Sequence, residues 1–363
     1  MTALAFGRRS GGGLAALRSP RAWVIPGLAL GVVVVVVVAG MTGAMAVPAS
    51  AVLHMLFGWT GLWAGAPLDE ATVTVLSVIR LPRVAMAALI GATLAVMGAV
   101  MQALFRNPLA DPGLIGVSSG AAVAAAASIV LGSSLPLFGA LPSGMVLPVA
   151  AFAGGLAVTA LVYTFSVRDG QPSLSLMLLA GIAMNALGGA VIGLFVYLAD
   201  DAQMRQLTFW TMGGLGAMTP GTLIPAAVLM ALALGGVLFT ARALNLLLLG
   251  EAEAYHLGVR VEALKRVCIV LVALGVGAGV AVAGTIAFVG LVAPHLVRLM
   301  AGPDHRRVLP GAACMGAILL TGSDLIARTI AVPAEMPVGL VMAGIGGPFF
   351  LVMLLRVRAA GGV

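Results

Sequence analysis

One short motif in the chain has the residue types of a hydrolase active site. Residues 116–120 read Gly-Val-Ser-Ser-Gly, which fits the Gly-x-Ser-x-Gly pattern of a nucleophilic serine at a strand-to-helix turn. Here the motif follows a proline-rich turn and begins an apolar run, and none of the four histidines is forced near it as a general base. We expect Ser118 and Ser119 to cap a helix and the glycines to permit close packing. An intramembrane serine protease is the enzyme alternative.

Two further signatures of chemistry are missing from the sequence. A Walker A phosphate loop needs Gly-x-x-x-x-Gly-Lys-Ser/Thr, and the single lysine of the chain, Lys265, lies in Ala-Leu-Lys-Arg. The histidines and cysteines have no metal-ligand spacing, and His295 and His305 lie among arginines, which disfavours a metal ion. We therefore expect no enzyme, no metal site and no permanent cofactor. Any ATP hydrolysis would belong to another chain.

The composition is that of a membrane protein. Apolar residues make up 61% of the 363 residues and charged residues only 9%, against roughly a quarter charged in soluble domains. The net charge of +7 is carried by residues that separate apolar runs, so we expect no nucleic-acid partner. A membrane helix needs about 20 apolar residues, and the chain has room for roughly ten of them.

The apolar runs predict an all-α, polytopic protein in which residues 1–363 form a single transmembrane domain. The ten predicted spans are about 22–46, 84–105, 114–132, 145–167, 176–198, 222–241, 265–284, 286–301, 308–327 and 336–355. With the N-terminus inside, only four of the 19 Lys and Arg residues lie outside: Arg80, Arg83, Arg205 and Arg328. The positive-inside rule then places both termini in the cytoplasm.

The longest polar stretch between spans runs from residue 241 to 266. It is too short for a domain and too polar to cross a membrane. We predict one or two short cytoplasmic helices over residues 242–264, broken at Gly250 and Gly258. A simple loop is one interpretation, but the mixture of charged and apolar residues favours a docking surface for a soluble partner.

Three arginines at the expected outer face could bind carboxylates. Arg80 and Arg83 lie just before the second span, and Arg328 follows the ninth span with Asp324 one helical turn earlier as a possible partner. Snorkelling at the interface would explain all three. Because they run against the positive-inside bias, we also consider that they capture carboxylates of a partner protein by bidentate pairing.

The fourth outer arginine, Arg205, lies in a segment with two aromatic residues. Residues 200–210 also contain Met204, Phe209 and Trp210. An interfacial aromatic belt is sufficient to explain the aromatic side chains. Together with the cation, they would also suit a flat, apolar and anionic ligand.

Several longer motifs occur in order along the chain. They are RLPR at 80–83, GATLA at 91–95, QALFRNPLADP at 102–112, GVSSGA at 116–121, AFVGLVAPH at 287–295, GPDHRR at 302–307, DLIAR at 324–328 and EMPVG at 335–339. With these motifs the chain resembles the FecCD-type permeases of ABC importers for iron-siderophores, heme and vitamin B12. The resemblance covers nearly the whole chain past residue 60.

The resemblance implies the fold and assembly of a type II ABC importer permease. The family has ten membrane helices in the lipid of the bacterial inner membrane and works as a homodimer. Two separate ATPase subunits bind ATP below the dimer, and a periplasmic substrate-binding protein docks above it. The substrate would pass along the dimer interface without covalent chemistry in this chain.

The family's functional positions match residues of this sequence. The resemblance implies binding-protein docking by Arg80, Arg83 and Arg328, cytoplasmic gates at Asn107 and Leu109 and at Leu174 and Ser175, and ATPase coupling by Leu249, Gly250, Glu251, Leu257 and Gly258.

The segment from residue 203 to 210 is similar to the heme permeases of the family. There an arginine at the position of Arg205 is thought to handle heme at the entrance of the pathway. The resemblance therefore implies heme as the transported substrate, with a ferric siderophore or cobalamin as alternatives. A self-sufficient secondary transporter is a remote alternative, since such proteins usually place ionisable residues deep in the membrane, where this chain has few.

Overall fold

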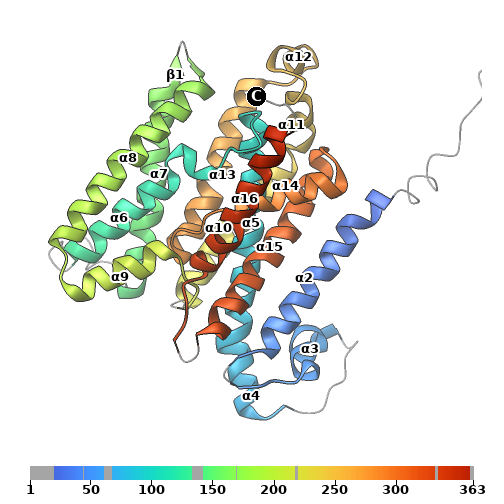
Figure 1. Ribbon diagram of the computed structural model, residues 1–363, viewed down its shortest axis with the longest axis vertical. Helices are drawn as coiled ribbons and strands as arrows, with labels where there is room; N and C mark the ends of the chain where they lie inside the picture. The colour runs from blue at the N-terminus through green and yellow to red at the C-terminus, as the bar shows by residue number, and fades with distance from the viewer. Residues whose placement is uncertain are drawn as a thin grey trace, which may run out of the picture.

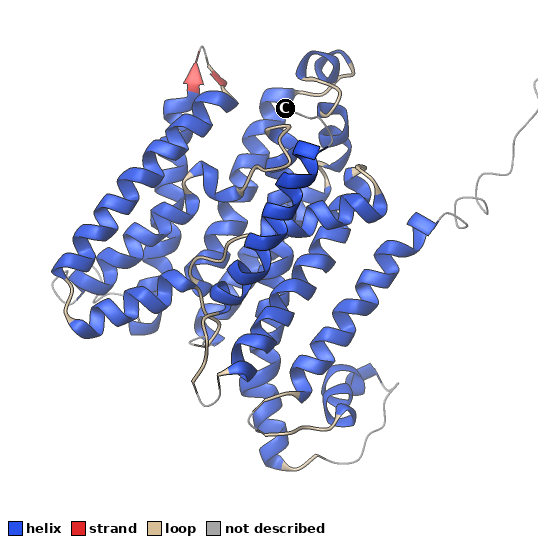
Figure 2. Ribbon diagram, viewed as in Figure 1, coloured by secondary structure: helices blue, strands red, loops and turns tan. Residues whose placement is uncertain are grey.

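A computed structural model of the chain describes residues 20–43, 45–60, 68–132, 142–168, 170–216, 220–331 and 334–359. Nearly all of this is helical (Figure 2). The described strands are β1 (Val167–Arg168) and β2 (Gln171–Pro172), which pair as a small antiparallel hairpin between two helices. The predicted all-α class is confirmed. The basic residues before residue 20 and the last four residues lie outside the described part.

Within the described ranges, seven helices are long and apolar enough to cross a membrane and three more are shorter and apolar. They are α2 (Val24–Met41), the helix that ends in α5 (Leu81–Leu104), α6 (Val117–Leu131), α7 (Ser143–Ser166), α8 (Leu174–Leu198), α10 (Pro220–Leu238), α13 (Val261–Ala283), α14 (Val289–Ala301), α15 (His305–Ile330) and α16 (Val338–Ala359). Each overlaps one predicted span, and the ends differ by a few residues except in the second span, whose helix begins at Glu70.

The bundle is built around α5 (Figure 1). This helix packs against α15, α14, α13 and α10, while α2 covers the outer side of α15. Helices α6, α7 and α8 form a neighbouring layer that contacts the centre mainly between α7 and α13. Glycines set the closest approaches, because a Cβ on Gly91 would collide with the carbonyl of Gly316 and one on Gly98 with the carbonyl of Gly290.

Short helices lie at both ends of the bundle. One end, which we call the α12 end, carries the β-hairpin, α11 (Ala241–Leu247) and α12 (Glu251–His256). The other, the α9 end, carries α3 (Ala49–Phe57), α4 (Glu70–Thr74) and α9 (Asp201–Met212) (Figure 1). Four short helical segments complete the described part of the chain: η1 (Pro20–Trp23), η2 (Gly58–Thr60), η3 (Val75–Arg80) and η4 (Pro112–Ile115).

The second membrane helix is longer than the sequence indicated. We expected Arg80 and Arg83 to precede it, but α4, the π-helical turn η3 and α5 form one continuous 35-residue helix from Glu70 to Leu104. Pro82 does not end the helix, because it stands in the first turn of α5, where the wider turn η3 accommodates the missing N–H donor. The two arginines therefore project from the side of a helix.

The Gly-Val-Ser-Ser-Gly motif begins α6, and half of its predicted role is wrong. Gly116 is the N-cap, with φ of +79°, and no described side chain caps the helix; Ser119 Oγ instead donates to the carbonyl of Gly116 at 3.1 Å. The packing role is confirmed, because a Cβ on Gly120 would collide with the carbonyl of Gly154 in α7. The motif thus joins two helices, and no strand precedes it among the described residues.

Candidate functional site

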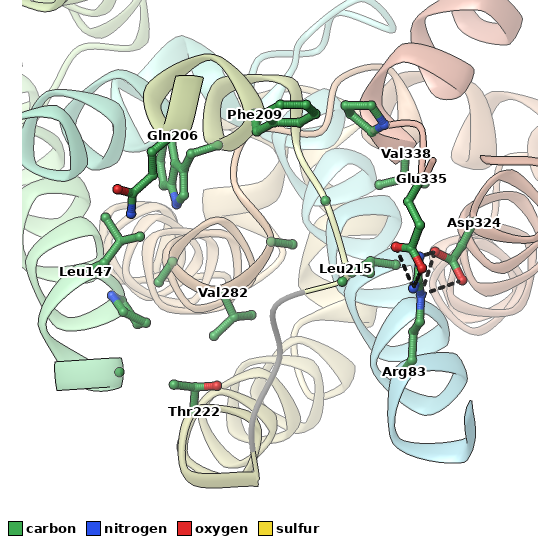
Figure 3. A pocket seen from close by; sticks show the side chains of 18 of the residues that line it. Arg83, Leu147, Gln206, Phe209, Leu215, Thr222, Val282, Asp324, Glu335 and Val338 are labelled. Carbon is green, nitrogen blue, oxygen red and sulfur yellow. Dashed lines mark hydrogen bonds and ion pairs between the residues drawn. The ribbon is translucent and has the colours of Figure 1, made fainter. Parts of the chain in front are cut away.

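An arginine with two carboxylate partners lies at the α9 end of the bundle (Figure 3). Arg83 of α5 donates from Nε and Nη2 to Asp324 of α15, with the Nη2–Oδ1 distance at 2.9 Å. Its Nη1 donates to both oxygens of Glu335, at 3.0 and 2.9 Å. Asp324 is fully buried, whereas the Glu335 side chain is 54% exposed. Arg83 therefore has one inner and one outer carboxylate, each held by two donor bonds or more.

The other two outer arginines pack around the same place. Arg328 Nε lies 3.6 Å from Asp324 Oδ2, which confirms the partner expected one turn earlier. The Arg328 guanidinium also donates to backbone carbonyls of Ala39 and Thr42 at the end of α2. Asp324 is thus neutralised from two sides, as a buried charge requires.

Arg80 is buried and faces α2 as well. Its Nη1 donates to the carbonyls of Gly40 at 2.9 Å and Met41 at 3.1 Å, and its Nη2 donates to the carbonyl of Met45. The structure therefore brings Arg80, Arg83 and Arg328 together, but gives each guanidinium partners inside the chain. Glu335 belonged to a motif in the sequence, and its distance of 252 residues from Arg83 gave no sign that the two side chains pair.

A cavity of about 500 Å³ opens beside Arg83 at the α9 end. Figure 3 shows Arg83 with Asp324 and Glu335 on one side of the cavity. Gln206 and Leu147 lie on the other side, and Phe209 lies at its edge. The floor and walls include Trp210, Leu215, Thr222, Val282 and Val338. The cavity thus combines a cation paired with two carboxylates and a largely apolar, partly aromatic wall.

Helix α9 supplies the aromatic side of this cavity. Its first turn is fixed by a capping box in which Asp200 accepts from the backbone N–H of Gln203 at 2.8 Å while Gln203 accepts from that of Asp200 at 3.1 Å. Gln206, Phe209 and Trp210 line the cavity. Arg205 is exposed and is not part of the lining, and no other described residue binds its guanidinium.

The four predicted gate residues lie at the α12 end, two of them after the end of α5 and two at the start of α8. Asn107 is exposed in the turn after α5, and its Oδ1 accepts from the backbone N–H of Leu109 at 2.9 Å. Leu174 and Ser175 begin α8, where Leu174 is partly buried and Ser175 exposed. The turn η4, which follows Asn107 and Leu109, packs against α8. The contact between η4 and α8 therefore links the pair Asn107 and Leu109 to the pair Leu174 and Ser175.

The predicted breaks at Gly250 and Gly258 separate the short helices at the α12 end. Gly250 has φ of +131° between α11 and α12, and Gly258 has φ of +88° after α12, values that only glycine adopts without strain. Glu251 anchors α12 by accepting from Lys265 of α13 at 2.7 Å. The side chains of Leu249, Tyr255 and Leu257 are 61%, 70% and 58% exposed, which leaves an apolar face uncovered.

Three comparisons with known proteins agree with this architecture. A family model described as the FecCD transport family matches residues 31–356. The chain is 52% identical over 282 residues to the hemin transport system permease protein HmuU of Yersinia pestis, a match that covers 77% of this chain and 83% of that protein. It is 41% identical over 301 residues to the cobalamin import system permease protein BtuC of Halobacterium salinarum, covering 80% and 76%.

A solved structure shows the same arrangement of helices. It is an inward-facing conformation of a metal-chelate type ABC transporter, and it superposes with a TM-score of 0.79 at 30% identity, covering 92% of this chain and 99% of that chain. The order of motifs, the apolar helices around α5 and these matches lead to one conclusion: the chain is a multi-pass membrane permease that belongs to the FecCD transport family.

Proposed function

We propose that this chain is the permease through which an ATP-driven ABC importer moves heme across the bacterial inner membrane. The main support for heme as the substrate is the 52% identity to a hemin permease over most of both chains. The cavity at the α9 end supports it, since Phe209 and Trp210 offer flat apolar surface beside charged groups. Heme is a large flat ring with two carboxylates, which suits this combination.

The α9 end faces the periplasm and the α12 end faces the cytoplasm. This orientation is supported by the basic residues of the α12 end, which carry the positive charge that cytoplasmic loops usually have: Arg242, Arg260, Lys265, Arg266, Arg298, Arg306 and Arg307. With an even number of spans, both termini lie in the cytoplasm.

The permease works as a homodimer with two ATPase subunits. Exposed apolar side chains along α8, among them Leu179, Ile182 and Leu187 at 58% to 65% exposure, support a second copy as the partner of this face. Residues 242–264 couple the permease to the ATPases, and the exposed Leu249, Tyr255 and Leu257 support this role. ATP binds and is hydrolysed on the partner subunit.

A periplasmic binding protein docks on the three outer arginines, Arg80, Arg83 and Arg328. In the structure these arginines bind carboxylates and carbonyls of the chain itself, so docking exchanges one internal partner for one on the binding protein. Glu335 is the partner that can leave, since its side chain is half exposed while Asp324 is fully buried. Arg83, which stays bound to Asp324, then pairs with a carboxylate of the binding protein.

Transport moves the substrate from the outer cavity to the gates. Arg205, exposed next to the aromatic residues of α9, attracts a propionate as heme leaves the binding protein. Closure of the ATPases pushes α12, and the movement reaches Asn107 and Leu109 and the start of α8 at Leu174 and Ser175. Heme leaves to the cytoplasm between these residues without a covalent step.

Cobalamin is the alternative substrate, because a cobalamin permease is 41% identical over 301 residues. Ferric siderophores remain a further possibility within the family. A growth experiment distinguishes heme from ferric siderophores as the substrate. A strain without its own heme permease should grow on heme as its iron source only when this chain, its ATPase and its binding protein are all present. Growth on a ferric siderophore but not on heme would reject heme as the substrate.

A further inference from the structure

A second cavity lies away from the proposed pathway residues, in a groove between α7 and α13. Its volume is about 350 Å³, and its wall is almost entirely apolar. Its lining includes Leu156, Thr159 and Thr164 of α7 and Arg266, Ile269 and Ala273 of α13. None of these residues belongs to the three docking arginines, the four gate residues or the coupling segment 242–264. The groove is therefore a separate feature of the membrane-spanning part.

The groove is polar at the α12 end and apolar deeper in the membrane. Arg266 stands near the start of α13, and Ala273 lies seven residues further, about 10 Å along the helix axis. On α7, which runs the opposite way, Thr164 lies near the end and Leu156 about 12 Å deeper. The cationic mouth is thus at the membrane surface, and the floor is at the depth of acyl chains.

The cation at the mouth has no acidic partner among the described residues. Lys265, its neighbour, binds both Glu251 at 2.7 Å and Glu262 at 3.3 Å. Those two carboxylates are thereby engaged, and Arg266 is exposed without an ion pair or hydrogen bond to the described part of the chain. A free guanidinium at a membrane surface is a good binding partner for a phosphate group.

A buried hydroxyl inside the groove also lacks a partner. Thr159 is only 4% exposed, yet its Oγ1 makes no hydrogen bond to the described part of the chain. A helical threonine usually donates to a carbonyl one turn earlier, and an unmade bond at a buried position is costly. Thr159 is five residues from Thr164, about 7.5 Å deeper than the mouth. The oxygen itself has almost no exposed surface, so a ligand acceptor at this depth would satisfy the hydroxyl once the Thr159 side chain rotates toward the groove.

We propose that the groove between α7 and α13 is a binding site for one anionic phospholipid. The phosphate pairs with Arg266, an ester carbonyl accepts from Thr159, and one acyl chain lies along Ile269 and Ala273. A phospholipid has these three parts in this order, a phosphate, ester carbonyls several ångströms deeper, and then an apolar chain. The inference needs only the membrane location of the helices and is independent of the transported substrate.

Native mass spectrometry of the full-length chain, purified together with its ATPase, tests this site. The protein is exchanged into mixtures of phosphatidylglycerol and phosphatidylcholine and then delipidated. We expect wild-type protein to retain phosphatidylglycerol in preference to phosphatidylcholine. Arg266→Gln should lower phosphatidylglycerol retention about tenfold, since one charge-assisted bond is lost. Arg242→Gln, an exposed arginine of α11 outside the groove, is the matched control and should change little.

A second variant and a second readout distinguish a specific binding site from lipid that merely surrounds the protein. Thr159→Val should lower retention of both lipids about threefold and leave the headgroup preference unchanged. Phosphatidylglycerol with a photoreactive acyl chain should label residues 156–160 and 269–273. Equal retention of both lipids by wild type, or an equal loss in Arg242→Gln, would mean surrounding lipid only and overturn the site. A shift from dimer to monomer in Arg266→Gln with retention unchanged would instead mean that a second protomer covers the groove.

Discussion

Glu335 closes the outer side of Arg83. Both of its carboxylate oxygens accept from Nη1 of the arginine, at 3.0 and 2.9 Å, while Asp324 occupies the inner side. The guanidinium of Arg83 therefore faces the α9 end with a carboxylate already bound. A partner protein that offers a carboxylate at this place competes with a residue of the permease itself.

Replacing Glu335 by Gln should strengthen docking of the binding protein. The substitution removes the competing charge and leaves a side chain of the same shape. We expect an affinity gain of roughly threefold to tenfold at low salt, because the pair is partly exposed and screened. Binding kinetics on nanodisc-embedded permease would measure it, with Glu253→Gln on α12 as an exposed acidic control. Weaker docking after Glu335→Gln would contradict the proposed exchange.

Replacing Asp324 by Asn should destabilise the fold itself. The carboxylate is fully buried and lies against both Arg83 and Arg328, so its removal leaves Arg83 paired with the half-exposed Glu335 alone and Arg328 without a carboxylate among the described residues. Breaking a buried pair of this kind costs about 3–5 kcal/mol. Thermal unfolding in detergent would report the loss. Asp201→Asn, at the exposed start of α9, should have a much smaller effect. Similar stability of the two variants would show that Asp324 is not a structural charge.

Replacing Arg205 by Ala should slow heme transport without affecting assembly. Because Arg205 is exposed and binds no other described residue, its loss leaves the fold unchanged. We expect transport to fall by about threefold to tenfold, the size of one exposed charge contact with a propionate. Uptake kinetics with purified components would measure it, and Arg307→Ala, at an exposed position outside the coupling segment, provides the control at the opposite end. Normal heme uptake would reject a role for Arg205.

Replacing Tyr255 by Ser should weaken the association with the ATPase. Tyr255 is 70% exposed on α12, and aromatic residues at the centre of an interface often contribute about 2 kcal/mol or more. The measured quantity is the amount of ATPase that copurifies with the permease. Val78→Ser is the control, since Val78 is 65% exposed but lies in η3 at the α9 end. Equal copurification of both variants would remove α12 from the coupling surface.

Replacing both Ser118 and Ser119 by Ala should leave transport largely intact. Among the described residues, Ser119 Oγ bonds only the carbonyl of Gly116, and the close packing of α6 on α7 depends on Gly120. The double variant would be compared with wild type in the same uptake experiment. A complete loss of function with normal folding would revive the serine-nucleophile interpretation.

The apolar helices could be predicted because each membrane span is a long apolar run. The start of α5 could not, because Arg80, Pro82 and Arg83 have the composition of a loop. Only the structure shows that a π-helical turn carries the chain through Pro82 and that the arginines find acceptors on α2 and α15. Polar groups inside a helix are compensated by tertiary contacts, which local sequence patterns do not reveal.

The functional site was predictable in part. Arg80, Arg83 and Arg328 could be selected from charge bias and motif resemblance, and Asp324 from its position one turn before Arg328. The role of Glu335 depends on a contact across 252 residues, and the cavity depends on how α9 lies over α7 and α16. Such contacts are set by the packing of the whole bundle. The breaks at Gly250 and Gly258 were predictable because glycine tolerates positive φ locally.

ATP-driven uptake into proteoliposomes tests the central claim most directly. The vesicles would contain this chain with its ATPase, and the binding protein would be supplied loaded with heme, ferric siderophore or cobalamin. We predict that heme accumulates inside, and only when both ATP and the binding protein are present. Uptake of siderophore or cobalamin without heme would keep the importer and change its substrate. Heme uptake without ATP would contradict the account of an ABC importer permease.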